Sequence, residues 1–271
     1  MRWINLKPNR SAALTLGLLP FGLLVGAYLA GSAARLAVNP DDKLLPSLVS
    51  LADAINRMAF IKDSRTGDYL LWSDTLASLE RLGSGLAIST VIALVIGMIV
   101  GMLPYARALF APVIAVIAMV PPLALLPILF ILLGLGETAK ITLIVIGVAP
   151  TMIRDLTLRV MELPREQIVK AETLGGSSWQ IAIRVVLPQI LPRLLTALRL
   201  QLGPAWLFLI AAEAISSDAG LGYRIFLVRR YLAMDVIFPY VAWITLLAVL
   251  MNVGLEAIRS GAFPWSNAPR P

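Results

Sequence analysis

The chain has 271 residues, of which 59% are hydrophobic and 14% charged, with a mean hydropathy of +0.84 and a net charge of +7. This composition excludes an ordinary water-soluble globular domain. The absence of cysteine and histidine excludes disulfides, thiol nucleophiles, Cys/His zinc sites and a histidine general base. In so apolar a chain we assign the positive charge to membrane topology and contact with the lipid bilayer, and not to nucleic acid.

Long uncharged segments predict several crossings of a membrane. A helix needs about 20 apolar residues to cross a hydrocarbon core of about 30 Å, and charged side chains are absent from residues 11–34, 82–106 and 236–255. Residues 108–136 are also uncharged but rich in proline, which favours one broken span over two complete ones. Two shorter runs become spans when flanking lysine and arginine side chains reach the membrane surface. The sequence therefore predicts an all-α integral membrane protein with six spans, at about 12–34, 82–103, 110–133, 138–156, 196–216 and 236–256.

The connections between the spans predict an orientation. An even number of spans places both termini on one face. The larger number of basic residues there, which include Arg2 and Lys7, predicts that this face is cytoplasmic. The external loop 35–81 carries apolar residues at helical spacing between Leu44 and Met58, which indicates an amphipathic surface helix, with a solvated loop as the alternative.

Glycine and proline occupy defined places within the apolar segments. Glycine pairs at 22/26 and 97/101 predict close approach between helices. Pro121, Pro122 and Pro127 break the third predicted span. They are consistent with a gate whose freed carbonyls face a translocation path, and equally with a packing kink.

Glu213 lies within the fifth predicted span, where a carboxylate costs about 2.5 to 3.5 kcal/mol on insertion scales. It is a candidate for the translocation path or gate, with a structural hydrogen bond to a neighbouring helix as the alternative. Arg199 is a poor partner, because the two residues lie about 21 Å apart along one helix at about 1.5 Å per residue. Residues 216–218 predict an outward loop, and Arg224 beyond it is expected to meet lipid headgroups or an anionic partner surface.

The connection between the fourth and fifth spans, residues 157–193, is patterned as two short helices. Pro164 suits the first turn of one helix, and Gly175 and Gly176 end it. Ser177, with Gln180 three residues later, forms a capping-box pattern for the second helix, which Pro188 is expected to end. A rigid helix, turn and helix on the cytoplasmic face suits contact with another protein, and a connector that packs under the bundle is the alternative.

This connection resembles the cytoplasmic signature of permease subunits of type I ATP-binding-cassette importers, which reads Glu-Ala-Ala, three residues, Gly, nine residues and Ile-x-Leu-Pro. The match is partial, because Val169 replaces the acidic residue of the triplet and leaves Glu172 or Glu166 as the candidate carboxylate. The resemblance implies that the residues that couple the permease to an ATPase are Ala171, Glu172, Gly175, Gly176, Val185, Leu187 and Pro188.

A wider resemblance covers residues 44–265. It rests on six strings in the same order: LPS at 45–47, SLERL at 78–82, PPLALLPILFILLGLGETAK at 121–140, VVLPQILP at 185–192, AAE at 211–213 and GLGY at 220–223. These strings are similar to the nitrate, sulfonate and taurine branch of importer permeases, and the stretches at 202–215 and 220–231 resemble permeases associated with urea-carboxylase or guanidine use.

The resemblance implies one permease domain over residues 1–271 in the inner membrane, working by alternating access. The expected partners are an ATPase subunit dimer, a second permease subunit in a homodimer, with a heterodimer as the alternative, and an extracytoplasmic solute-binding protein. The chain has no G-x-x-x-x-G-K-S/T sequence, so we expect it to be no enzyme and to bind no cofactor or metal, while the partner ATPase uses ATP and Mg²⁺. The alternatives are a self-sufficient carrier or channel, whose duplicated halves are missing here, and a membrane enzyme, whose catalytic set is missing. The transported solute stays open.

Overall fold

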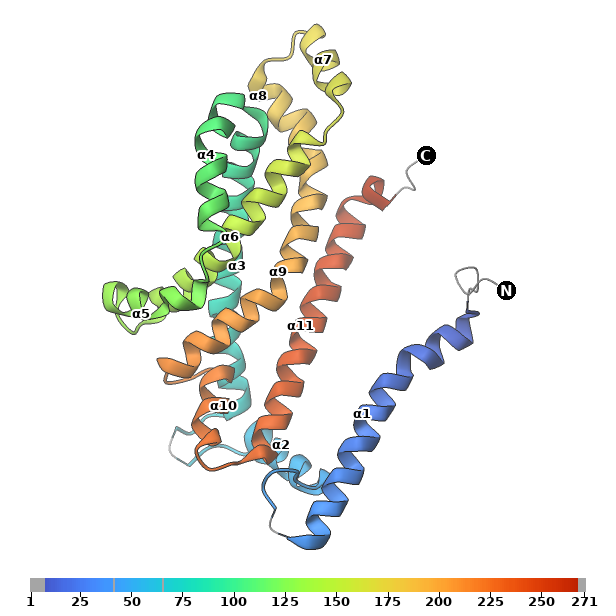
Figure 1. Cartoon of the computed structure of the whole chain (residues 1–271), viewed down its shortest axis with the longest axis vertical. Helices are drawn as coiled ribbons and strands as arrows, with labels where there is room; N and C mark the ends of the chain where they lie inside the picture. The colour runs from blue at the N-terminus through green and yellow to red at the C-terminus, as the bar shows by residue number, and fades with distance from the viewer. Residues whose placement is uncertain (1–7, 41, 65, 268–271) are drawn as a thin grey trace.

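The computed structural model describes residues 8–40, 42–64 and 66–267, and in these ranges the chain is built from helices and their connections (Figure 1). Arg2 and Lys7, which contribute to the predicted orientation, lie outside them. Five described stretches are long and apolar enough to cross a membrane: α1 (Arg10–Val38), α3 (Leu70–Met102), α6 (Glu137–Met161), the run of α8 and α9 (Ser178–Ile215) and α11 (Met234–Ala262). The shorter α4 (Pro104–Ile117) and α5 (Pro122–Leu133) qualify together as a sixth, bent by 93°.

Two helices begin earlier than the sequence predicted. α3 starts at Leu70 and not at 82, because the polar side chains of its first turns, which look like loop residues, are buried and paired inside the bundle. α9 (Leu187–Ile215) starts well before 196, and Pro188 lies in its first turn, directly after a π-helical turn at Ala182–Val186. The expectation that Pro188 ends a helix is therefore wrong.

Small residues allow α3 and α6 to pack closely at the centre of the bundle. Every fourth residue of α3 is small and buried, in the series Gly85, Ser89, Ala93, Gly97 and Gly101. A Cβ atom added to Gly97 would lie 2.9 Å from Leu156 Cβ, and one added to Gly101 would lie 2.5 Å from Val160 Cβ. The close approach predicted for this glycine pair is confirmed, whereas a Cβ atom on Gly22 or Gly26 would meet no described atom within 4 Å.

Replacing Gly101 by alanine is expected to lower the melting temperature of the purified permease. The added methyl group would overlap Val160, and overpacking of a closely packed interior costs about 1 to 3 kcal/mol. Gly83→Ala in the same helix is the matched control, because its Cβ atom would meet nothing within 4 Å and alanine favours the helix by up to about 1 kcal/mol. Equal melting temperatures for the two variants in one detergent would contradict the packing argument.

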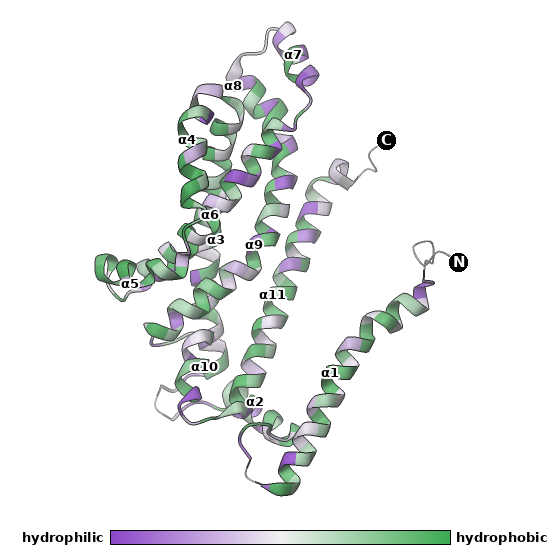
Figure 2. Cartoon of the chain, in the orientation of Figure 1, coloured by the Kyte–Doolittle hydropathy of each residue, from purple (hydrophilic) through white to green (hydrophobic). Residues whose placement is uncertain are grey.

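The first helix stands away from the other spans and is attached near one end. In Figure 1, α1 and α11 diverge from their shared end beside α2 (Leu48–Phe60), and Figure 2 shows apolar residues around most of α1. The Tyr28 hydroxyl donates to the carbonyl of Pro46 at 2.6 Å, and the Tyr28 ring meets the edge of Phe238 in α11, with centroids 5.6 Å apart. α2 is capped by Ser47 and spans residues 48–60, so it overlaps the surface helix predicted between Leu44 and Met58 but begins four residues later.

Candidate functional site

The helix, turn and helix of the 157–193 connection forms one tip of the molecule, at the opposite end from α2 (Figure 1). It consists of α7 (Arg165–Thr173), α8 (Ser178–Ile181) and a π-helical turn, η2 (Ala182–Val186), that continues into α9. The capping box predicted for Ser177 and Gln180 is confirmed, with both of its hydrogen bonds present. We call residues 165–186 the cytoplasmic tip, after the face of the membrane that the sequence predicts for this connection.

Both glycines of the tip are favoured by local geometry, for different reasons. Gly175 has a φ of +80°, in the left-handed region that favours glycine, and a Cβ atom there would point into open space. A Cβ atom on Gly176 would lie 2.8 Å from the carbonyl oxygen of Ala171, which accepts the Gly176 N–H at 3.0 Å. The turn that ends α7 therefore favours glycine at 175 for its backbone conformation and at 176 for its close contact with Ala171.

The coupling candidates divide into exposed and packed residues. Glu172 and Gly175 are exposed on the tip, whereas Ala171, Gly176, Val185, Leu187 and Pro188 are half-buried along α7, the turn and the junction with α9. Two residues outside this set of coupling candidates are the most prominent apolar groups here, with Leu174 80% and Trp179 74% exposed. Large apolar side chains in so exposed a place indicate a surface that another protein covers.

Two of the three candidate gate prolines lie where the α4–α5 pair bends. Pro121 is the N-cap of α5, Pro122 its first residue, and Pro127 lies inside the helix. α5 projects sideways from the bundle in Figure 1, and Ile131 and Leu132 on it are exposed. The predicted break in this span is therefore present, at Pro121 and Pro122.

Glu213 is completely buried and fully engaged in hydrogen bonds. Its carboxylate accepts from Ser78 Oγ at 2.8 Å, from Arg81 Nη1 at 2.7 Å and from the backbone N–H of Gly222 at 2.8 Å. Arg199 lies apart from it and pairs with Glu256 and Asn252. This environment fits the structural hydrogen bond that the sequence left as the alternative for Glu213.

A second buried carboxylate, Asp74, holds the start of α10 (Leu221–Arg229). Asp74 accepts from the Gly220 N–H at 2.9 Å, from Arg224 Nε at 2.8 Å and from the Tyr240 hydroxyl at 3.0 Å. Arg224 therefore faces the interior, and its expected contact with lipid or a partner is wrong. Because an unpaired buried charge is costly, these contacts fix α10 against α3 and α11.

One carboxylate of this network reaches solvent. Glu137, the first residue of α6, is 56% exposed and pairs with Arg81, which is 8% exposed, and with Lys140, which is 3% exposed. The sequence signal for the network was the spacing of Asp74, Ser78 and Arg81, which places three polar groups on one face of α3. That signal was missed because residues 70–81 were expected to form a loop.

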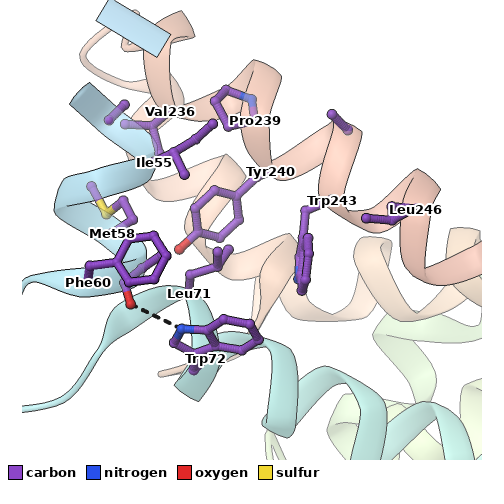
Figure 3. A pocket seen from close by; sticks show the side chains of 13 residues that line it. Ile55, Met58, Phe60, Leu71, Trp72, Val236, Pro239, Tyr240, Trp243 and Leu246 are labelled. Carbon is purple, nitrogen blue, oxygen red and sulfur yellow. Dashed lines mark hydrogen bonds between the residues drawn. The ribbon is translucent and has the colours of Figure 1, made fainter. Parts of the chain in front are cut away.

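A separate pocket of about 450 Å³ opens between α2, α3 and α11 (Figure 3). Figure 3 shows Trp72 and Trp243 beside it, and the Trp72 indole N–H donates to the carbonyl of Ala59 at 3.0 Å. Its polar groups are the Tyr240 hydroxyl, which is directed to Asp74, and the indole N–H groups of Trp72 and Trp243. The other lining side chains are almost all apolar, so the pocket suits packing and lipid better than a polar solute.

Comparison with known proteins gives a consistent set of similarities. A family profile described as "Binding-protein-dependent transport system inner membrane component" matches residues 90–260. A taurine transport system permease protein of Escherichia coli (strain K12) is 35% identical over 198 residues, covering 73% of this chain and 72% of the relative. A putative aliphatic sulfonates transport permease protein of the same strain is 29% identical over 250 residues, covering 92% of this chain and 91% of the relative.

The fold also has a solved counterpart. A chain of the MetNI methionine ABC transporter, solved in inward-facing conformations, superposes with a TM-score of 0.63 at 21% identity. The superposition covers 73% of this chain and 99% of that chain. The likeness shows that the two chains share a fold.

Proposed function

Because the chain belongs to the family of binding-protein-dependent transport system inner membrane components, we propose that it forms the passage for a small sulfonate. It is a multi-pass inner-membrane permease of an ATP-binding-cassette importer and has no ATPase activity of its own. The self-sufficient carrier and the membrane enzyme are thereby set aside. The observation that supports a sulfonate is the similarity to permeases named for taurine and for aliphatic sulfonates, two solute classes that share this anionic group.

A binding-protein-dependent importer requires an ATPase and a solute-binding protein as partners. Beyond these two, we assign the importer a second copy of this chain and two ATPase subunits, which bind the ATP and Mg²⁺. The exposed apolar side chains of α5 support a second copy, since they project from the bundle where another protomer can cover them. Residues 1–271 then act as one permease domain with both termini in the cytoplasm.

In this assembly the cytoplasmic tip meets the ATPase. Leu174 and Trp179 provide apolar anchors, Glu172 provides the carboxylate that Val169 lacks, and Gly175 forms the turn between them. The packed residues Ala171, Gly176, Val185, Leu187 and Pro188 connect the tip to α9. Closure of the ATPase dimer on ATP would then move α9 through a rigid connection.

The gate is assigned to the bent α4–α5 pair, with Pro121 and Pro122 at its break and Pro127 inside α5. Carbonyl groups freed by proline are tolerated at membrane depth where they line a cavity or meet protein. We assign Glu213 a structural role and no contact with the solute, because both of its carboxylate oxygens accept hydrogen bonds from residues of the same protomer.

The function is tested by reconstituting the permease with its ATPase and binding protein in liposomes and measuring uptake of radiolabelled taurine. Uptake is expected to need ATP and both partners, and to be reduced by excess aliphatic sulfonate. A matched preparation without ATPase should show none. Uptake by the permease alone would contradict the importer assignment, and ATP-driven uptake of another solute with none of taurine would contradict the sulfonate.

A further inference from the structure

The charged group around Arg81 has one side buried in protein and one side open. Arg81 Nη1 faces inward and donates to Glu213 at 2.7 Å and to the carbonyl of Ala219 at 2.7 Å. The opposite edge of the guanidinium, Nε and Nη2, donates to both oxygens of Glu137, with 2.9 Å from Nη2 to Oε1. Lys140 Nζ donates to the same carboxylate at 3.0 Å.

Arg81 and Lys140 can together hold an oxyanion from two sides. We call this pair of side chains the cradle. The planar edge of an arginine matches two oxygens of a carboxylate or of a sulfonate, and a lysine adds a point charge. Arg81 and Lys140 are nearly inaccessible, whereas the Glu137 side chain that fills the cradle is 56% exposed. Glu137 is thus the accessible member of the group, and its removal would leave two buried cations with one buried carboxylate.

The position of the cradle adds to its preference for anions. Glu137 is the first residue of α6, and the partial positive charge of a helix N-terminus favours an anion close to it. The connection before it includes Gly134, with a φ of +77°, and directly follows the gate candidate α5. Ser216 Oγ, just after α9, donates to the carbonyl of Leu135 at 2.8 Å and ties this connection to α9.

We propose that Arg81 and Lys140 form an anion subsite on the translocation path, closed by Glu137, and that the sulfonate of the passing solute takes the place of the Glu137 carboxylate. This inference rests on the proposed function and names the residues that recognise its solute. An exchange of one anion for another keeps the buried cations paired throughout. Opening without an anion would leave these two buried cations with Glu213 as their one carboxylate, so the subsite favours anionic solutes over neutral ones of similar size.

The test compares Glu137→Gln with wild type in the complete permease–ATPase complex in detergent. The variant removes the carboxylate that pairs with Arg81 and Lys140. Sodium methanesulfonate is therefore expected to raise the melting temperature of the variant relative to sodium chloride at equal ionic strength. The expected increase is about 5 °C or more at a concentration near 100 times Kd. Wild type should shift little, because Glu137 competes. Glu256→Gln is the matched control, since Glu256 likewise pairs with two cations, Arg199 and Arg259. An equal shift in Glu137→Gln and Glu256→Gln would overturn the subsite.

A second variant covers the case in which Glu137→Gln fails to assemble. Since the chain has no cysteine, Glu137→Cys carries a unique thiol for charged methanethiosulfonate reagents. Each modification rate is divided by the rate of the same reagent with free cysteine. On this scale the sulfonate-bearing reagent is expected to react with Glu137→Cys at least about tenfold faster than the ammonium-bearing one. An attraction of about 1.4 kcal/mol between the sulfonate and the two cations corresponds to this factor of ten. Lys140→Met in the same chain should reduce this gain. Equal relative rates with both reagents would overturn the proposal.

The two proposals fail in different ways. If wild-type liposomes import taurine while Glu137→Gln does not respond to methanesulfonate and Glu137→Cys shows no charge preference, the subsite is wrong and the function stands. If the variants respond as expected and the wild-type importer moves no sulfonate, the anion site stands and the proposed solute is wrong.

Discussion

Replacing Arg81 by methionine is expected to prevent recovery of a stable permease. The substitution keeps much of the side chain's length but leaves the fully buried Glu213 without its cation. Removing one partner of a buried ion pair costs about 3 to 5 kcal/mol, which is a large part of the roughly 5 to 15 kcal/mol that stabilises a typical folded protein. The measurement is the yield of monodisperse permease–ATPase complex and its melting temperature after extraction from the membrane.

Two further variants identify the cause of that loss. Arg57→Met removes an exposed arginine whose ion pair with Asp235 is 3.3 Å long, and exposed pairs contribute less than about 1 kcal/mol. Arg81→Met combined with Glu213→Gln removes the unpaired charge and should restore part of the stability. If Arg81→Met is as stable as Arg57→Met, the buried network does not hold these helices together.

The membrane helices could be predicted from the sequence because their main determinant is local. A run of apolar residues of sufficient length identifies a span whatever its neighbours are, and the spans around 12–34 and 236–256 were found in this way. The starts of α3 and α9 were predicted too late in the chain, because a helix start with polar residues is decided by more than local sequence. Polar residues in the first turns of α3 were assigned to a loop, and only the distant partners that neutralise them allow the helix to continue.

The cytoplasmic tip shows the same division between local and distant determinants. The turn at Gly175 and the capping box at Ser177 depend on neighbouring residues, and both could be predicted from sequence spacing. The exposure of Leu174 and Trp179 depends on what the bundle leaves uncovered, which spacing does not reveal. The sequence did not decide whether Glu213 lines the translocation path or makes a structural hydrogen bond, because its partners Ser78 and Arg81 lie more than 130 residues away in the chain.

Replacing Gly175 by tryptophan is expected to reduce ATP-driven uptake by at least about thirtyfold while the permease remains folded in the membrane. A left-handed backbone costs a residue with a side chain about 1 to 2 kcal/mol, which the fold can tolerate, and the Cβ atom would point into open space. A bulky group on the exposed tip would instead separate it from the ATPase. Loss of one central interface contact costs 2 kcal/mol or more, or about thirtyfold in affinity. Uptake and co-purification of the ATPase measure the effect.

Gly67→Trp provides the matched control for this prediction. Gly67 also has a left-handed backbone, with a φ of +76°, and a Cβ atom there would also meet nothing within 4 Å, but it lies in the connection between α2 and α3, away from the cytoplasmic tip. The two variants therefore carry the same backbone strain and the same added bulk, and differ in the surface on which the bulk lies. Gly175→Asn, which accepts the left-handed conformation with a small side chain, should keep most of the uptake. If Gly67→Trp loses uptake as Gly175→Trp does, the loss comes from strain. If Gly175→Trp transports normally, the cytoplasmic tip is not the ATPase contact.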